Sequence, residues 1–312
     1  MAYHQRVTET NARTLPRGVM VALATPTDAH GELDDAGLQK LIDHVLAGGV
    51  SGVCPVGSTG EGPRFTVEQR LVITARVRSL VPASVAVVPA LGVTSIACAH
   101  SELMRLAELM VTAALVAPPS YYPLAADEAF DFYAGLADAA EVPLVLYNIP
   151  SFTKVSIPLD AVSRLASHPR IVGIKDSSRD MEYLSEVLVA THGAPDFGVY
   201  TGTDTLLTAS LAIGADGTIA ASANVVPQLS VGICTAMEEM DRHRALELQR
   251  ELTKIVLACR RGASPSGWKA AIHALGICGA DCVPPANPLA DPLRAELVRD
   301  LRDLGVLDRH AR

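Results

Sequence analysis

The chain has 312 residues, of which 49% are hydrophobic and only 19% charged, so it can bury one large core. Its formal net charge of −8 argues against nucleic acid as a partner, because binding to phosphates needs a basic face. The polar stretch 1–17 contains no apolar run long enough for a signal peptide or a membrane span. We therefore expect a flexible arm there, no membrane partner and a cytoplasmic location.

Short apolar runs alternate along the chain with longer amphipathic stretches. Runs rich in Val, Ile, Leu and Ala are typical of parallel strands buried on both faces. The runs occupy residues 18–26, 49–57, 85–92, 113–119, 142–150, 171–177, 197–204 and 217–222. Between the runs, helical stretches begin at capping residues such as Asp34 and Thr66 and stop at glycines such as Gly48.

Eight alternating β and α units predict a closed parallel barrel of the (β/α)8 TIM type over residues 18–225. Beyond it the strand runs cease, which predicts a C-terminal helical extension over 226–312, packed on the barrel. Its helical patterns lie at about 228–260, 265–278 and 291–306. An open doubly wound sheet is the alternative, but the strict alternation and the lack of a GxGxxG fingerprint favour the barrel.

Six cysteines are spread through the chain. They lack the dense spacing of a disulfide framework and the paired spacing of a zinc site. Cys278 and Cys282 lie four positions apart, but no second pair completes a set of four ligands. We therefore expect buried or unreactive thiols rather than a metal site.

In barrels of this type the active site gathers at the carboxyl ends of the strands. Lys175 ends the sixth apolar run and is one of only five lysines, against twenty-one arginines. Burial there disfavours the charged ammonium, and the neutral amine is the form that makes an imine with a ketone. A lysine that extends from the strand end into solvent is the alternative.

Two further strand ends could contribute to the same cavity. Tyr147 ends the fifth run, where its phenol could move protons beside an imine, although a core tyrosine with a bonded hydroxyl is the alternative. The loop 57–60 after the second run offers the hydroxyls of Ser58 and Thr59 together with backbone N–H groups. Such a loop can hold a carboxylate. Glu61 fits a supporting role better than a catalytic one.

Five segments, in this order, resemble the dihydrodipicolinate synthase/N-acetylneuraminate lyase family of pyruvate-dependent class I aldolases. They are GSTGE (57–61), the YYP segment (121–123), YNIP (147–150), GIKDSS (173–178) and GADGTIAASAN (214–224). The resemblance runs from about Gly18 to the C-terminus, and the twenty-eight positions between Tyr147 and Lys175 add to its specificity. It implies an enzyme that forms a Schiff base with pyruvate or another 2-oxo acid.

The resemblance also implies roles for individual residues. Lys175 matches the Schiff-base lysine, and Tyr147 matches the tyrosine that acts as general acid and base. Ser58 and Thr59 match the pair that holds the carboxylate of the 2-oxo acid and links the proton relay. Tyr121 matches a catalytic relay tyrosine, which many relatives contribute across a subunit interface.

Other implied features concern the pocket and the assembly. Gly202 and Ile219 match positions whose backbones line the substrate pocket. Members of the family are commonly homotetramers, built as dimers of dimers, and need no metal or organic cofactor. We therefore expect a homotetramer that takes two small-molecule partners, pyruvate and an aldehyde.

One departure from the family pattern concerns the second substrate. Dihydrodipicolinate synthases carry an arginine five residues beyond the catalytic tyrosine, where it holds the carboxylate of aspartate semialdehyde. Here Phe152 occupies that position in the substrate-binding region, and Lys154 stands where a glycine is usual. A phenyl ring cannot replace a charge-assisted hydrogen bond worth ~1.5–3 kcal/mol. Lys154 could replace it only as a flexible point charge.

This departure favours a lyase that acts on a 2-keto-3-deoxy sugar acid or a related 4-hydroxy-2-oxo acid. A 4-hydroxy-tetrahydrodipicolinate (dihydrodipicolinate) synthase remains an alternative. A second is a 2-keto-3-deoxy acid dehydratase, which forms the same imine but expels water and leaves the carbon chain intact. A third is a catalytically silent binding or regulatory barrel, since fold alone does not secure function.

Overall fold

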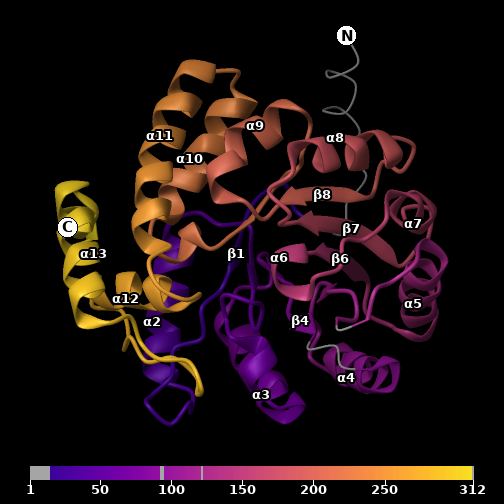
Figure 1. Cartoon of the computed structure of the whole chain (residues 1–312), viewed down its shortest axis with the longest axis horizontal. Helices are drawn as coiled ribbons and strands as arrows, with labels where there is room; N and C mark the ends of the chain where they lie inside the picture. The colour runs from indigo at the N-terminus through magenta and orange to yellow at the C-terminus, as the bar shows by residue number, and fades with distance from the viewer. Residues whose placement is uncertain (1–14, 92–94, 121, 311–312) are drawn as a thin grey trace.

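Strands and helices alternate along the chain, and the strands lie side by side as a parallel sheet inside a ring of helices (Figure 1). The computed structural model describes residues 15–91, 95–120 and 122–310. The arm expected at 1–17 lies outside the described residues up to position 14. Tyr121 also lies outside them.

Each of the eight apolar runs contains at least one strand. The strands are β1 (Gly18–Ala22), β2 (Gly52–Cys54), β3 (Ala86–Val87), β4 (Ala90–Leu91), β5 (Ala114–Val116), β6 (Leu144–Asn148), β7 (Ile171–Asp176), β8 (Gly198–Thr201) and β9 (Gly217–Ala220). The run 85–92 carries both β3 and β4, because Pro89 has no N–H to donate to the ladder. The backbone of this run still pairs on both sides: Val88 N donates to Val53 O, and Leu115 N donates to Pro89 O.

The sheet closes on itself through this run. The strand order is β3-β2-β1-β9-β8-β7-β6-β5-β4, so its two ends belong to one continuous stretch of chain. Residues 85–91 thereby join β2 to β5 and leave no free edge among the described strands. The expected TIM barrel is confirmed, and the open doubly wound sheet is wrong.

One outer helix follows each run of strand. These helices are α2 (Asp35–Ala47), α3 (Val67–Leu80), α4 (Ile96–Glu108), α5 (Ala126–Ala139), α7 (Leu159–Leu165), α8 (Met181–Ala190), α9 (Leu207–Ala212) and α10 (Pro227–Glu238). Both expected N-caps are confirmed: the Asp34 side chain accepts from Gly37 N, and Thr66 forms a capping box with Gln69. Gly48 follows α2 as its C-cap.

The C-terminal helices are also present: α11 (Arg242–Cys259), α12 (Ser266–Ala274), α13 (Asp291–Asp303) and α14 (Val306–His310). The helical pattern at 228–260 is divided between α10 and α11 by a turn at Met240, whose φ is 62°. Asp241 then caps α11 by accepting from Arg244 N. None of the described helices combines the length and the apolar composition needed to cross a membrane.

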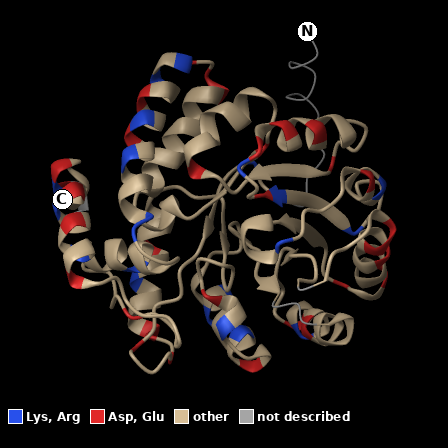
Figure 2. Cartoon of the chain, viewed as in Figure 1, with Lys and Arg blue, Asp and Glu red and all other residues tan. Residues whose placement is uncertain are grey.

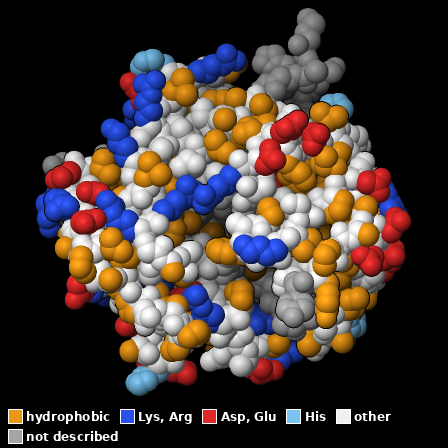
Figure 3. All heavy atoms as spheres, in the orientation of Figure 1, with side chains coloured by type: hydrophobic (Ala, Val, Ile, Leu, Met, Phe, Trp, Pro, Cys, Tyr) orange, Lys and Arg blue, Asp and Glu red, His pale blue; other side chains and the backbone are white. Residues whose placement is uncertain are grey.

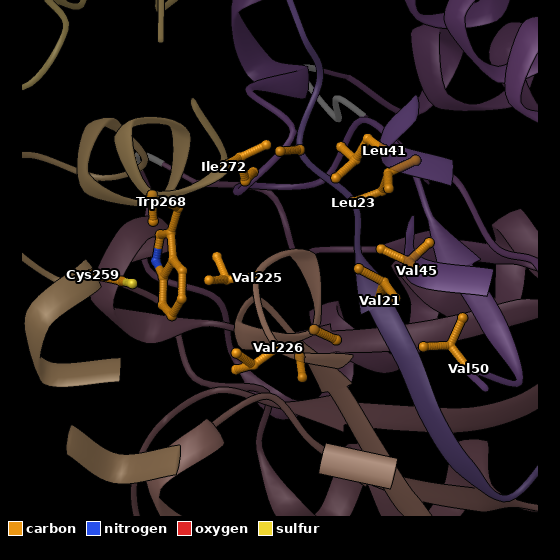
Figure 4. Close-up of a cluster of buried hydrophobic side chains, with 14 of the residues drawn as sticks. Val21, Leu23, Leu41, Val45, Val50, Val225, Val226, Cys259, Trp268 and Ile272 are labelled. Atoms are coloured by element: carbon orange, nitrogen blue, oxygen red, sulfur yellow. The ribbon is translucent and has the colours of Figure 1, made fainter. Parts of the chain in front are cut away.

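The largest hydrophobic cluster joins these C-terminal helices to the barrel. In Figure 4 the ring of Trp268, from α12, lies beside Cys259 of α11 and faces Val225, which follows β9. Val21 of β1 and Leu41 of α2 belong to the same cluster. The extension therefore packs against the first and last strands through buried side chains rather than through surface polar contacts.

A separate cluster fills the inside of the barrel. It includes Tyr147, Tyr200 and Ile219 together with Leu15, which precedes β1 and is 2% exposed. The Tyr200 hydroxyl donates to Pro16 O at 2.9 Å. The residues just before β1 thus occupy the amino-terminal end of the barrel, and the reactive side chains collect at the opposite end.

Candidate active site

Lys175 and Tyr147 are register partners on β7 and β6. Their side chains therefore leave adjacent strands toward the same, inner face of the barrel. Each residue is only 5% exposed. The Lys175 Nζ donates to the Tyr147 hydroxyl at 3.3 Å and lies 4.3 Å from the centroid of its ring. The pair thus places a buried amine against a group that can accept and return a proton.

The loop after β2 brings a second hydroxyl to this pair. Ser58 Oγ lies 3.4 Å from the Tyr147 hydroxyl, so the two can share a proton path. Ser58 and Thr59 are both half-buried. Gly60 holds the loop close to β1, because a Cβ there would lie 2.6 Å from Leu23 O. A larger residue at position 60 would push the two hydroxyls away from their present positions.

Glu61 ends the same loop and anchors it to the C-terminal extension. Its carboxylate is completely buried and accepts from Lys269 Nζ at 2.8 Å, from Arg64 at 2.6 Å and from Val283 N at 3.0 Å. Lys269, on α12, is 1% exposed and also donates to Thr27 Oγ1 at 3.0 Å. The supporting position expected for Glu61 matches these contacts, whereas nothing in the sequence pattern pointed to Lys269 as its partner.

Gly202 directly follows β8, and Ile219 lies on β9; these are the next two strands around the barrel after β7. Gly202 N donates to Asp176 O at 2.6 Å, and a Cβ at Gly202 would lie 2.8 Å from Lys175 Cε and 2.0 Å from Ser177 Oγ. Only glycine fits there without moving the lysine. Ile219, on β9, is 1% exposed and belongs to the cluster inside the barrel.

The two residues that depart from the family pattern lie on the surface after β6. Phe152, in the short helix α6 (Pro150–Thr153), is 57% exposed. Lys154 follows α6 with φ 62° and ψ 10°, a left-handed conformation that glycine adopts without strain. Its Nζ donates to Ser151 O at 2.8 Å. Neither side chain has a hydrogen bond to Lys175 or Tyr147 in the described part of the chain.

Sequence reasoning treated Cys54 as one idle thiol among six, but the structure places it within electrostatic reach of Lys175. Burial raises the pKa of the Cys54 thiol to about 12, and the positive charge of Lys175 opposes this shift. Cys54 ends β2 and lies inside the barrel. Its thiol therefore stays protonated and adds no charge to the inside of the barrel near the amine.

Sequence reasoning also gave no role to the carboxylate that follows Lys175. Asp176 accepts from Asn148 Nδ2 at 2.7 Å and from Ser178 Oγ at 2.8 Å. Burial raises the pKa of Asp176, and these hydrogen bonds partly offset the shift. Asn148 Oδ1 in turn accepts from Ile157 N at 3.0 Å. The network holds the ends of β6 and β7 together, directly beside Tyr147 and Lys175.

The donor sets that metals require are not assembled among the described residues. No group of three or more His, Cys, Asp or Glu side chains in that part of the chain is arranged to hold a metal ion. The polar groups gathered at Lys175 are an amine, a phenol and a hydroxyl, which suit acid–base and imine chemistry.

Comparisons with known proteins agree with this site. The model of the dihydrodipicolinate synthetase family matches residues 15–304. A DapA-like lyase from Halobacterium salinarum is 35% identical, over 93% of this chain and 94% of its own. The 4-hydroxy-tetrahydrodipicolinate synthase of Phenylobacterium zucineum is 32% identical, over 93% of this chain and 98% of its own.

Solved structures with the same fold belong to the same family. The dihydrodipicolinate synthase of Thermotoga maritima superposes with a TM-score of 0.90 at 26% identity, covering 94% of this chain and all of that one. A prophage protein from E. coli K12, solved in complex with pyruvate, gives 0.88 at 29% identity, covering 93% and 99%. The silent, non-catalytic barrel is therefore not the favoured interpretation. The chain belongs to the dihydrodipicolinate synthetase family and is a class I lyase, which works through a lysine Schiff base.

Proposed function

We propose that Lys175 captures the ketone of pyruvate, or of a longer 2-oxo acid, as a Schiff base. The observation that carries the proposal is the buried amine, held 3.3 Å from the Tyr147 hydroxyl at the carboxyl ends of β6 and β7. Relatives from E. coli K12 and Acinetobacter baumannii were solved in complex with pyruvate, which supports pyruvate as a substrate here.

The chemistry follows from the imine as an electron sink. The Lys175 amine adds to C2 of the 2-oxo acid and water leaves, which gives a protonated imine. When the C3–C4 bond breaks, its electron pair moves into the imine to form an enamine, while Tyr147 takes the proton of the C4 hydroxyl and an aldehyde departs. Protonation of the enamine at C3 and hydrolysis then release pyruvate and restore the amine. Condensation is the same path reversed.

The carboxylate of the 2-oxo acid is assigned to the loop after β2. Ser58 and Thr59 offer hydroxyl donors there, and Ser58 lies 3.4 Å from the Tyr147 hydroxyl. Fixing the carboxylate also fixes the neighbouring ketone toward Lys175, which removes rotational freedom before the chemical step. The backbones of Gly202 and Ile219 are proposed to line the pocket, and Tyr121 to extend the proton relay.

The substrate is proposed to be a 2-keto-3-deoxy sugar acid or a related 4-hydroxy-2-oxo acid, whose cleavage releases pyruvate and an aldehyde. Phe152 supports this choice, because a phenyl ring cannot donate to the carboxylate of aspartate semialdehyde. The second candidate is 4-hydroxy-tetrahydrodipicolinate synthesis, the activity named for relatives about one third identical. A dehydratase that leaves the carbon chain intact is the third.

Reduction by borohydride in the presence of pyruvate, followed by peptide mass mapping, tests the central proposal. We expect a stable adduct on Lys175, and no adduct in Lys175→Ala. Absence of the adduct from the wild type would overturn the proposal. The substrate is tested by measuring pyruvate release from a panel of 4-hydroxy-2-oxo acids beside a coupled condensation assay with aspartate semialdehyde. Strong condensation would favour the synthase, and turnover without pyruvate release the dehydratase.

The assembly belongs to the same proposal. We expect a homotetramer built as a dimer of dimers, with Tyr121 reaching across an interface. Light scattering after size-exclusion chromatography measures the mass in solution. A monomer with full activity would remove the need for a tyrosine from a neighbouring subunit. The cytoplasmic location stays a prediction, which cell fractionation can test.

A further inference from the structure

Two side chains directly behind the reactive pair join the strands that carry it. Asn148 directly follows Tyr147 on β6. Asp176 directly follows Lys175 on β7, and Asn148 and Asp176 are register partners in their turn. Successive side chains of a strand leave on opposite faces, so these two point outward while the reactive pair points into the barrel. The outward pair is thus placed to act on a molecule bound at Lys175 only through the backbone.

Asp176 places a carboxylate in the interior of the protein. In Figure 2 most charged residues lie on the outer helices and loops, but a basic and an acidic stretch of ribbon adjoin at the carboxyl end of β7. Figure 3 shows acidic side chains spread over the surface, where water solvates them. Asp176, by contrast, is only 3% exposed, and Asn148 is completely buried. Burial of such groups is costly unless their polar atoms are hydrogen-bonded.

The four polar side-chain atoms of this pair all have hydrogen bonds. Asn148 Nδ2 donates to Asp176 Oδ1 at 2.7 Å, and Asn148 Oδ1 accepts from Ile157 N at 3.0 Å. Asp176 Oδ2 accepts from Ser178 Oγ at 2.8 Å, and Oδ1 also accepts from Ser178 N at 3.2 Å. Ser178 Oγ accepts in turn from the backbone of Asp180, which caps α8. The pair therefore links β6 and β7 to the segment before α7 and to the start of α8.

The main chain is hydrogen-bonded at the same level. Ser177 N donates to Asn148 O at 2.8 Å. Gly202 N donates to Asp176 O at 2.6 Å, and position 202 is where an added Cβ would lie 2.8 Å from Lys175 Cε. A displacement of Asp176 would therefore move both the strand that carries the lysine and the glycine beside it.

The proposed reaction needs the amine and the phenol at a fixed separation. Lys175 Nζ and the Tyr147 hydroxyl lie 3.3 Å apart, slightly beyond the usual range for a hydrogen bond, so a small shift of either strand would separate them. Misplacement of reacting groups by 1 Å can cost about 10²-fold in rate. The β6–β7 ladder also has a register irregularity between Leu144 and Val145, toward its other end. A side-chain hydrogen bond at the carboxyl ends fixes an alignment that this ladder alone specifies less firmly.

We propose that Asn148 and Asp176 are positioning residues. Their hydrogen bond sets the separation of the Lys175 amine and the Tyr147 hydroxyl, and the negative charge of the carboxylate is not what carries the role. The proposal rests on the proposed Schiff base and adds two residues that act on it without touching the substrate.

An exchange of the two side chains separates geometry from charge, because asparagine and aspartate have nearly the same size and shape. In the double variant Asn148→Asp/Asp176→Asn, the carboxylate on β6 still accepts from Ile157 N and from the amide on β7. The amide oxygen on β7 still accepts from Ser178 Oγ. The hydrogen bond between the strands is retained, while the charge moves from one strand to the other.

Deuterium exchange into pyruvate measures the effect without an aldehyde. The imine on Lys175 loses a C3 proton to give the enamine, which takes up a deuteron from D2O, and NMR of the methyl group follows the exchange. Asn148→Asp sets one carboxylate against another and should lower the kcat of exchange about 10²-fold. The KM for pyruvate should change less than about threefold, because the loop after β2 is untouched. Adding Asp176→Asn should restore kcat to within about fivefold of the wild type.

Asp176→Asn alone removes the charge but keeps an oxygen that accepts from Asn148, so its kcat should stay within about fivefold of the wild type. Asp216→Asn is the matched control. It makes the same change in another buried carboxylate, which accepts from Val199 N at 3.0 Å at the amino-terminal end of the barrel. This control should leave kcat and KM within about twofold of the wild type.

Ser178→Ala is a milder variant that keeps the proposal testable if urea denaturation shows that Asn148→Asp is unfolded. It removes one hydrogen bond to Asp176 and should lower kcat about three- to tenfold. Equal losses in Asp176→Asn and Asn148→Asp, without recovery in the double variant, would assign the effect to charge and overturn the proposal. So would full exchange activity in Asn148→Asp.

Borohydride trapping of the wild type with pyruvate distinguishes this proposal from the one on which it rests. An adduct on Lys175 together with unaltered exchange in Asn148→Asp would overturn the positioning role alone. If the wild type forms no adduct, both proposals fall.

Discussion

Glu61 and Lys269 form an ion pair at 2.8 Å, completely buried, between residues 208 positions apart. The pair ties the loop that carries Ser58 and Thr59 to helix α12 of the C-terminal extension. Removing one partner of a buried pair leaves the other charged and desolvated, which is the costly case. Part of the site thus depends on a helix that contributes no group to the chemistry.

Lys269→Met should therefore lower the free energy of unfolding by about 3 kcal/mol, measured by urea denaturation. The double variant with Glu61→Gln should lose less than the sum of the two single variants, because it leaves no full charge buried alone. Arg76→Gln removes an exposed pair with Asp35 and should change stability by less than about 1 kcal/mol. A comparable effect from Arg76→Gln would contradict the importance of burial.

Tyr147→Phe should reduce turnover by a factor of about 10²–10⁴, because the hydroxyl that accepts and returns the proton is lost. Trapping of pyruvate on Lys175 should still be detectable, since the amine is retained. Tyr133→Phe provides the control: its hydroxyl is also buried but donates to Val116 O, on the outer side of the barrel wall. That variant should cost about 1 kcal/mol of stability and leave turnover intact.

Gly202→Ala should slow imine formation strongly, because its new methyl group would lie 2.8 Å from Lys175 Cε. The rate of pyruvate trapping measures this directly. Gly135→Ala makes the same change in the middle of α5, where nothing lies within 4 Å of the added Cβ. It should stabilise the protein by roughly 0.5–1 kcal/mol and leave trapping unchanged. Equal trapping rates in the two variants would show that position 202 tolerates a side chain.

The cysteines should differ sharply in their reaction with iodoacetamide. Burial raises the pKa of Cys54 and that of Cys234 to about 12. Near pH 8 only about one in ten thousand of these thiols is ionised, and thiolate is the reactive form. Exposed Cys98 should therefore be labelled first, with Cys54 labelled only after denaturation. Mass mapping of the native protein gives the order, and rapid labelling of Cys54 would contradict its burial.

Much of the fold could be predicted from the local pattern of apolar and polar residues in the sequence. Runs such as 171–174 are apolar on both faces, and the strict alternation of such runs with helices predicts a barrel. The sequence also predicted that Lys175 and Tyr147 lie close together, because both were expected at the ends of adjacent strands. The division into an arm (1–17), a barrel (18–225) and an extension (226–312) stays a prediction, and so do the roles of the site residues.

Other features had no local signal. The turn at Met240 contains neither glycine nor proline, so the pattern at 228–260 did not reveal it. Lys269 meets Glu61 and Thr27 only because α12 packs against the barrel, and the angle of that packing is decided by side chains distant in sequence. Long-range charge partners of this kind become visible only in three dimensions.

Leu15 and Pro16 occupy the amino-terminal end of the barrel, so we expect a molecule bound at Lys175 to exchange with solvent through the opposite end. Both products of a cleavage would then leave through the carboxyl-terminal end of the barrel. In the proposed reaction the aldehyde has no bond to the lysine, so it can leave while the oxo acid is still attached as the Schiff base. The order of product release would thus depend on the closed amino-terminal end of the barrel as well as on the chemistry at Lys175.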